Sequence, residues 1–115
     1  MKSPITTHVL DTSRGCAAAG IRVTLEKQAK QSVWRKLGED ATDVDGRCNT
    51  LMSPDARLTT GVYRLTFDTA SYFRSKHVKS FYPYISVAFE VKAGPAHCHV
   101  PLLISPFSYA TYRGS

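Results

Sequence analysis

The chain has 115 residues, a length that suits one domain around a single core. Its net charge of +6 permits attraction to anions, but the basic residues are scattered rather than gathered with aromatic residues on one stripe, which argues against nucleic-acid binding. The three cysteines lack CxxC spacing and no apolar run approaches the roughly 18 residues of a membrane span, so we expect a soluble protein with reduced thiols and no metal centre.

The first predicted strand spans residues 5–11. Its residues alternate with the period of two that a half-buried strand requires. The two faces consist of Ile5, Thr7 and Val9 on one side, and Thr6, His8 and Leu10 on the other. An imidazole therefore lies in mid-strand on one face of a sheet.

The middle of the chain continues this alternation at residues 21–26, 63–67 and 85–92. Turn-forming residues separate these runs, at positions 14–15, 45–46, 53–55, 60–61 and 93–95. Residues 68–77 depart from the pattern, because a capping aspartate is followed by about two turns without alternation, which predicts the only helix. The spacing predicts an all-β fold, an antiparallel sandwich of seven or eight short strands with one short helix.

The last predicted strand, residues 97–104, carries two histidines one residue apart. Its core face consists of Cys98, Val100, Leu102 and Ile104, and its outer face of His97, His99, Pro101 and Leu103. A histidine on an outer sheet face is ordinarily a solvated one. His8 alters that expectation, because the terminal strands of a sandwich can lie in one sheet. Two converging imidazoles could then share a proton or a water.

Several motifs in register along the chain carry a family resemblance. They are Thr7-His8-Val9-Leu10-Asp11, Asp45-Gly46-Arg47-Cys48, Phe81-Tyr82-Pro83-Tyr84, the run from His99 to Pro106, and Tyr112-Arg113-Gly114-Ser115. Together they resemble the hydroxyisourate hydrolases of the transthyretin family. The resemblance implies a transthyretin-like sandwich of two four-stranded sheets, formed by residues 1–115 as a single domain. It also implies a homotetramer, a dimer of dimers, in which outer sheet faces meet and line the sites.

The resemblance also assigns roles to residues. It implies His8, Arg47 and His99 as catalytic residues, and a substrate-binding set of His8, Arg47, Tyr112, Arg113, Gly114 and Ser115. It implies hydrolytic opening of the cyclic amide of 5-hydroxyisourate, a product of urate oxidation, without a cofactor or metal. His97 is left outside this set, because the family's histidine directly precedes Val-Pro-Leu-Leu. Which of His8 and His99 is the general base stays open.

Two other functions compete with this interpretation. The same fold carries thyroid hormone in transthyretin, but a hormone site favours a wider, apolar channel with small or hydroxyl side chains where this chain has His99 and Tyr112. A structural or adhesive sandwich would leave the histidines solvated, since one fold supports many functions. We expect a cytoplasmic location, with a peroxisomal or periplasmic one as the alternative, because the chain ends in Arg-Gly-Ser rather than the Ser-Lys-Leu peroxisomal signal.

Overall fold

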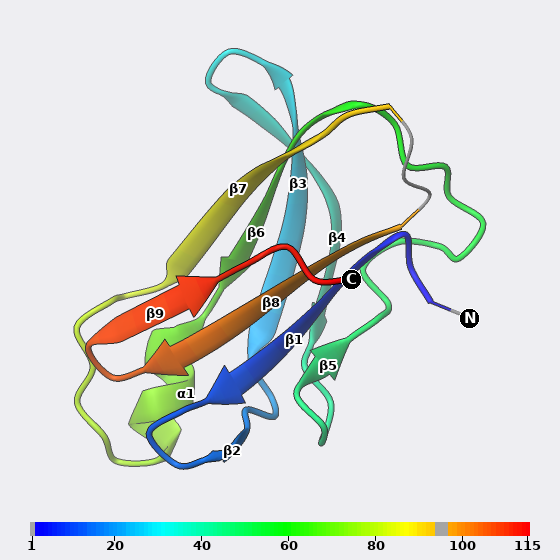
Figure 1. Cartoon of the computed structure of the whole chain (residues 1–115). Coiled ribbons are helices and arrows are strands. Elements are labelled where there is room, and N and C mark those ends of the chain that lie inside the picture. The colour runs from blue at the N-terminus through cyan, green and yellow to red at the C-terminus, as the bar shows by residue number, and fades with distance from the viewer. Residues whose placement is uncertain (1, 94–96) are drawn as a thin grey trace.

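Two β-sheets face each other in the computed structural model, which describes residues 2–93 and 97–115 (Figure 1). The first sheet has the order β2-β1-β8-β9 with β5 also paired to β1, and the second has the order β4-β3-β6-β7. The elements are β1 (Ile5–Asp11), β2 (Cys16–Ala17), β3 (Arg22–Lys30), β4 (Val33–Ala41), β5 (Arg47–Cys48), β6 (Gly61–Phe67), α1 (Thr69–Ser75), β7 (Ile85–Val91), β8 (Cys98–Ser105) and β9 (Ser108–Thr111).

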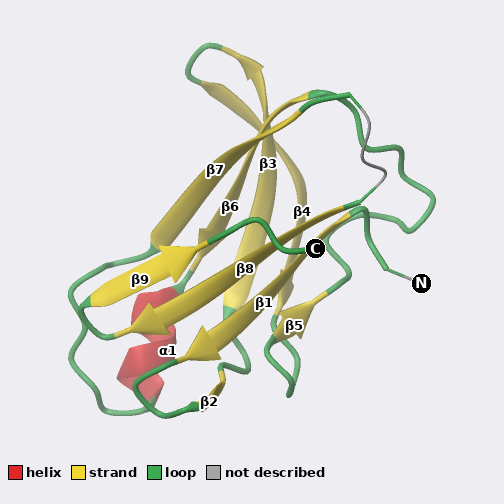
Figure 2. Cartoon of the chain, viewed as in Figure 1, coloured by secondary structure: helices red, strands yellow, loops and turns green. Residues whose placement is uncertain are grey.

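This architecture confirms the predicted transthyretin-like sandwich with one short helix (Figure 2). The first sheet has five strands rather than four, because the two-residue strands β2 and β5 both add to β1. β1 and β8 pair in parallel, whereas the other strand pairs of the described residues are antiparallel. No short turn connects β1 to β8, so the chain is free to enter the sheet in either direction at this point.

The core lies between the two sheets and follows from the alternation of the strands. Ile5 and Val9 of β1 and Leu102 of β8 are fully buried, and Leu65 and Phe67 of β6 approach them from the other sheet. Burial of such side chains contributes about 1.5–3 kcal/mol each. The inward faces of β1 and β8 are therefore fixed by the core, and this leaves Thr6, His8 and His99 on the opposite face.

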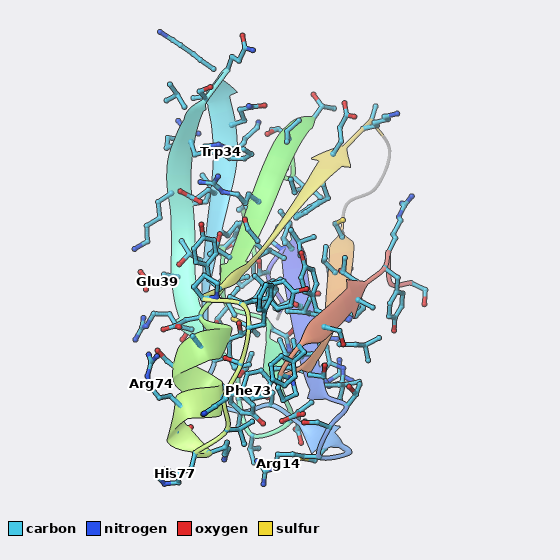
Figure 3. All side chains as sticks on the ribbon, turned by 90° about the vertical axis from the view of Figure 1, so that its left-hand side faces the viewer. Arg14, Trp34, Glu39, Phe73, Arg74 and His77 are labelled. Atoms are coloured by element: carbon cyan, nitrogen blue, oxygen red, sulfur yellow. The ribbon has the colours of Figure 1, made fainter. Side chains whose placement is uncertain are left out.

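The helix α1 closes one end of the sandwich. Asp68 is its N-cap, and the Asp68 side chain accepts a hydrogen bond from the Ser71 backbone N–H. Phe73 points into the core, whereas Arg74 and His77 point to solvent (Figure 3). The helix thus confirms the one predicted at residues 68–77. No helix among the described residues is long and apolar enough to cross a membrane.

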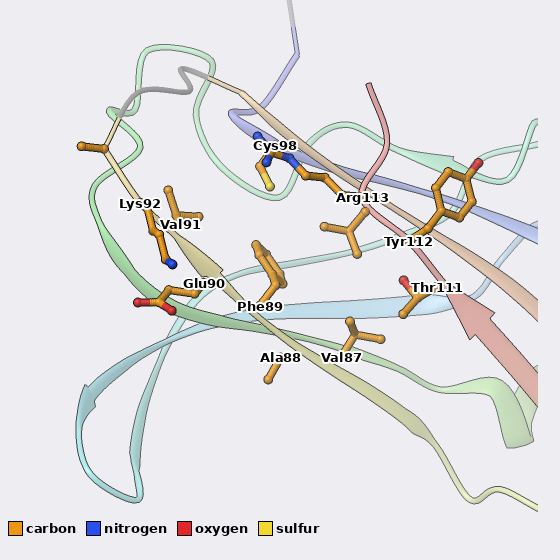
Figure 4. Close-up of a pocket in the computed structure, with 12 residues that line it drawn as sticks. Val87, Ala88, Phe89, Glu90, Val91, Lys92, Cys98, Thr111, Tyr112 and Arg113 are labelled. Carbon is orange, nitrogen blue, oxygen red and sulfur yellow. The ribbon is translucent and has the colours of Figure 1, made fainter.

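Both sheets end on the same side of the molecule, β7 at the edge of one and β9 at the edge of the other (Figure 1). A cleft of about 530 Å³ opens between these edges (Figure 4). Val87, Phe89 and Val100 give it apolar walls, and Thr111 and Arg113 line it from the carboxyl-terminal segment.

Candidate active site

The parallel register of β1 and β8 brings the predicted histidines together. Thr6 lies opposite His99 and His8 lies opposite Pro101, so the two imidazoles are diagonal neighbours on the outer face of the sheet. Both are half-buried. The two terminal strands therefore lie side by side, as the sequence suggested, and both histidines face away from the core.

Arg47 reaches this face from β5, where it pairs with His8. The preceding turn is held by the Asp43 carboxylate, which accepts 2.9 Å hydrogen bonds from the backbone N–H groups of Asp45 and Arg47. Gly46 has a φ of +77°, and a Cβ at this position would lie 2.4 Å from the Val9 carbonyl oxygen. The turn therefore requires glycine, and it places Arg47 next to His8.

The ring of His8 is fixed by the same turn. Its Nε2 lies 2.9 Å from the carbonyl oxygen of Asp45. A carbonyl oxygen only accepts hydrogen bonds, so Nε2 carries the proton that is donated. In the neutral ring the lone pair then lies on Nδ1, which is able to accept a hydrogen bond from a water or a substrate.

His99 is held from the other side by Thr6. The Thr6 hydroxyl lies 2.7 Å from His99 Nδ1, and Thr6 itself is only 1% exposed. Burial lowers the pKa of His99, and the nearby positive charges of Arg47, His97, His8 and Lys2 lower it further. A lowered pKa keeps the imidazole neutral around neutral pH, so that it is able to accept a proton.

The carboxyl-terminal segment packs directly on His99. The backbone N–H of Gly114 donates a 2.9 Å hydrogen bond to the His99 carbonyl oxygen, and the two residues form an isolated β-bridge. A Cβ on Gly114 would lie 2.6 Å from His99 Cδ2. Only glycine lets the segment lie this close to the imidazole.

The predicted substrate-binding residues at the carboxyl terminus do not all face His99. Tyr112 borders the cleft between β7 and β9, but its ring turns away from it (Figure 4). The side chain of Arg113 extends into that cleft, toward Cys98 on the core-facing side of β8 (Figure 4). Ser115 is exposed. The structure therefore brings His8, Arg47, His99 and Gly114 together, and it separates the Arg113 guanidinium group from them.

Two residues without a sequence-assigned role belong to the same hydrogen-bonded group. Thr6 contacts His99, and the Nε2 atom of His97 lies 3.2 Å from the same Thr6 hydroxyl. The rings of His97 and His99 are nearly parallel, with centroids 6.5 Å apart. The spacing of two between His97 and His99, and between Thr6 and His8, is the sequence signal that indicates a shared face.

This arrangement has the parts that hydrolysis of an amide requires. A neutral imidazole is able to take a proton from an attacking water, and an arginine is able to stabilise negative charge that grows on a carbonyl oxygen. Among the described residues, no group of three or more His, Cys, Asp or Glu side chains is arranged to hold a metal ion. The described site thus offers acid–base and electrostatic chemistry from its own side chains.

Comparisons with known proteins point to one family. The model of the HIUase/Transthyretin family matches residues 5–114. The protein named 5-hydroxyisourate hydrolase in Mus musculus is 45% identical over 114 residues, which cover 98% of this chain and 96% of the mouse protein. The structure of 5-hydroxyisourate hydrolase from Klebsiella pneumoniae superposes with a TM-score of 0.81 at 32% identity, covering 96% of this chain and 98% of that chain. Sea bream transthyretin, solved in complex with thyroxine, superposes with a TM-score of 0.89 at 27% identity, covering 97% of this chain and 95% of that one.

Proposed function

Because the chain belongs to the HIUase/Transthyretin family, we propose that it is a 5-hydroxyisourate hydrolase that acts in urate breakdown. The enzyme hydrolyses the cyclic amide of 5-hydroxyisourate and yields 2-oxo-4-hydroxy-4-carboxy-5-ureidoimidazoline. The observation that carries this proposal is the meeting of His8, Arg47 and His99 on one sheet face. The relatives that are named hydrolases match nearly the whole chain, and they favour this function over hormone transport.

His99 is the general base in this proposal. Its lowered pKa keeps it neutral, and its Nδ1 is the nitrogen that contacts Thr6, which leaves Nε2 for the water. The water oxygen bonds to the amide carbon as His99 takes a proton from it. Collapse of the tetrahedral intermediate then breaks the carbon–nitrogen bond, and the ring nitrogen receives a proton from the imidazolium.

His8 and Arg47 position the reactants. His8 has its Nε2 proton engaged with the Asp45 carbonyl, so its Nδ1 is able to accept a hydrogen bond that orients the water. Arg47 binds the anionic form of the substrate and stabilises the oxyanion, because its guanidinium group stays charged and presents several donors. Tyr112 and Ser115 contribute hydroxyl groups, and Gly114 keeps their segment against the site.

Assembly is the second part of the proposal. The enzyme is a homotetramer, a dimer of dimers, with its sites where the outer faces of two β2-β1-β8-β9 sheets meet. Two features support this. In one chain His8 is half-buried and Arg47 is exposed, and a second copy packed on this face would exclude water from them. The adjacent edge strands β7 and β9 also offer unpaired backbone for joining sheets.

A coupled assay tests the activity. Urate and urate oxidase generate 5-hydroxyisourate, and its ultraviolet decay is followed with and without the protein. We expect faster decay with the wild type and a loss of at least about 100-fold in kcat/KM for His99→Ala and for Arg47→Ala. His77→Ala and Arg74→Ala are the matched controls, because both side chains are exposed and lie at the helix end. Decay no faster than the spontaneous rate would refute the hydrolase.

Thyroid-hormone binding is the alternative, and the likeness to a transthyretin solved with thyroxine is the observation that favours it. Titration of the protein with thyroxine in a calorimeter distinguishes the two. Saturable thyroxine binding with no effect on 5-hydroxyisourate would establish the carrier function instead. The cytoplasmic location stays a prediction, which fits the free thiols of Cys16, Cys48 and Cys98.

A further inference from the structure

His97, Thr6 and His99 form a hydrogen-bonded group, and the reaction described above gives no role to His97 or to the Thr6 hydroxyl. Thr6 is almost completely buried on the outer face of the sheet, beneath two imidazoles. Its hydroxyl lies 2.7 Å from His99 Nδ1 and 3.2 Å from His97 Nε2. His97, in contrast, is exposed to solvent.

A hydroxyl group has one proton to donate, and a buried proton needs an acceptor. Among the described residues, the two imidazoles are the hydrogen-bond partners of the Thr6 hydroxyl. One of the two ring nitrogens must therefore be unprotonated. The proton on Thr6 couples the tautomers of the two histidines.

The two possible arrangements differ in what His99 is able to do. If Thr6 donates to His99 Nδ1, the neutral His99 ring carries its proton on Nε2 and has no lone pair there. If Thr6 donates to His97 Nε2, His99 Nδ1–H donates to Thr6, and His99 Nε2 is free to accept a proton. Only the second arrangement makes His99 Nε2 a base.

We propose that His97, acting through the Thr6 hydroxyl, holds His99 in the tautomer that leaves Nε2 unprotonated, and that His97 and Thr6 are therefore positioning residues of the hydrolase. This inference rests on the proposed function of the site. The carboxylate of a serine-protease triad fixes its histidine in a comparable way. Here the imidazole of His97, which acts through a hydroxyl, takes the place of that carboxylate.

The charges around His99 agree with this arrangement. The groups that face it are Arg47 on β5, His8 on β1, Lys2 before β1, and His97, all of them basic. Each of them lowers the pKa of His99 and so favours the neutral ring, which is the form that has two tautomers. Protonation of His99 removes the base, so we expect activity to fall as the pH falls through the pKa of this imidazole.

Kinetics of single and double variants test the proposal. We expect Thr6→Val and His97→Leu each to lower kcat about tenfold or more with little change in KM, because the base loses its orientation. Thr6→Ser keeps the hydroxyl and His97→Gln keeps an acceptor oxygen, so both should retain most of the activity. The Thr6→Val/His97→Leu double variant should be no slower than either single variant, since both changes break one unit.

Controls separate positioning from a structural effect. His77→Leu is the matched histidine control, and melting temperatures report whether each variant folds. Activity retained in Thr6→Ser and His97→Gln but lost in Thr6→Val and His97→Leu would show that the hydrogen-bonding groups matter, which a merely structural contact would not do. Wild-type kcat in folded Thr6→Val and His97→Leu would overturn the proposal.

A second measurement does not depend on the substrate. Nitrogen-15 NMR of the histidine rings at pH 8 reports which nitrogen of His99 carries the proton. We expect Nδ1 in the wild type and a shift toward Nε2 in His97→Leu. A wild-type His99 protonated on Nε2 would overturn the proposal whatever the kinetics. If the wild type does not accelerate decay of 5-hydroxyisourate, the proposed function fails, and the NMR result alone decides the tautomer.

Discussion

Gly114 determines how closely the carboxyl-terminal segment approaches the imidazole of His99. A Cβ at this position would lie 2.6 Å from His99 Cδ2 and 3.2 Å from Pro101 Cγ, distances that force either the ring or the segment to move. The side chain of the preceding residue, Arg113, extends away from the His99 imidazole, into the cleft on the core-facing side of β8. Within this tetrapeptide, glycine thus has the most specific steric role.

Gly114→Ala should lower kcat/KM about tenfold, because a base displaced by a few tenths of an ångström transfers protons poorly. The coupled decay assay measures this. Stability should change by less than about 1 kcal/mol, since the residue is half-exposed and near the end of the chain. An alanine variant as active as the wild type would mean that the segment does not constrain His99.

The pKa of His99 gives a prediction on pH. Since burial and nearby cations lower this pKa below the ordinary value of 6.5, an NMR titration should find its midpoint below 6.5. Arg47→Met removes a cation and should raise the midpoint, whereas Arg47→Lys keeps the charge and should raise it less. Between the lowered pKa of folded His99 and the ordinary value of 6.5, the folded chain binds fewer protons at this group than the unfolded chain. Folding therefore becomes less favourable as the pH falls through that interval. A midpoint above 6.5 would contradict the environment described for His99.

At the scale of single residues, the sequence predicted much of the site. Alternation placed His8 and His99 on faces away from the core, and the structure confirms both placements. The role of Thr6 could not be predicted, because it depends on the register between two strands that are distant in sequence. The direction of the Arg113 side chain could not be predicted either, since it follows from the pairing of Gly114 with His99.

The helix α1 ends in a motif that is normally built on glycine. The N–H of Val78 bonds to the Phe73 carbonyl and that of His77 to the Arg74 carbonyl, which is the Schellman pattern. His77 occupies the left-handed position of the motif, with a φ of 60°. A left-handed residue with a Cβ is thus held at the end of the helix.

His77→Gly should stabilise the protein by about 1 kcal/mol, because glycine has no Cβ to strain in the left-handed region. Chemical denaturation measures the free energy of unfolding. His77→Ala is the control and should give no such gain, since alanine keeps the Cβ. Equal stabilities of the glycine and alanine variants would show that the strain is negligible.

A buried hydrogen bond connects α1 to Asp11, the last residue of β1. The Tyr72 hydroxyl donates to the Asp11 carboxylate over 2.8 Å, and Asp11 is fully buried. Burial, together with the hydrogen bond to Asp11, raises the pKa of Tyr72 to about 12, so the phenol stays protonated at ordinary pH.

Tyr72→Phe should cost about 1–3 kcal/mol, because it leaves part of a buried carboxylate without its donor. Tyr82→Phe is a suitable control, since Tyr82 is a half-buried tyrosine that packs on the core from outside it. Thermal and chemical denaturation of the two variants give the comparison. A loss no larger for Tyr72→Phe than for Tyr82→Phe would mean that the hydrogen bond adds no stability.

Among the elements, those with clear alternation or a clear cap were predicted, whereas β4 and the two-residue strands were not. The helix and strands β1, β3, β6, β7 and β8 coincide with the patterns identified in the sequence. β4 was not predicted, because it lies at the edge of its sheet and most of its side chains are exposed or half-buried. β5 was not predicted, since two residues are too few to show any period.

For the whole molecule, the exposed edges of β7 and β9 bear on assembly. They border one apolar cleft, so a charge placed there should oppose the approach of a second copy. Thr111→Lys adds such a charge. Val33→Lys adds one to the exposed edge strand β4 and serves as the control.

We expect Thr111→Lys to sediment as a smaller species than the wild type, and its specific activity to fall on dilution. Val33→Lys should sediment like the wild type and be fully active. Analytical ultracentrifugation at several concentrations measures the first property, and the decay assay measures the second. A wild type that is monomeric and fully active would refute assembly as a requirement for the site.

The general architecture of the molecule followed from the sequence, but its connectivity did not. Strand alternation and turn spacing predicted a sandwich, and the family motifs made the prediction specific. The parallel direction of β8 relative to β1 has no local signal, because Thr6 and His99 are separated by 93 positions. Long-range pairing is decided by the whole core rather than by any one segment.

The distance along the chain between β1 and β8 also affects when the protein becomes functional during synthesis. The strands of the second sheet, β3, β4, β6 and β7, all precede β8 in the chain, so they leave the ribosome before His99 does. Contacts this distant are also slow to form, because a long loop must close first. An incomplete chain can thus already contain one whole sheet while His99, the proposed base, is still missing. The proposed site is completed only when β8 pairs with β1, so its activity would report a finished fold.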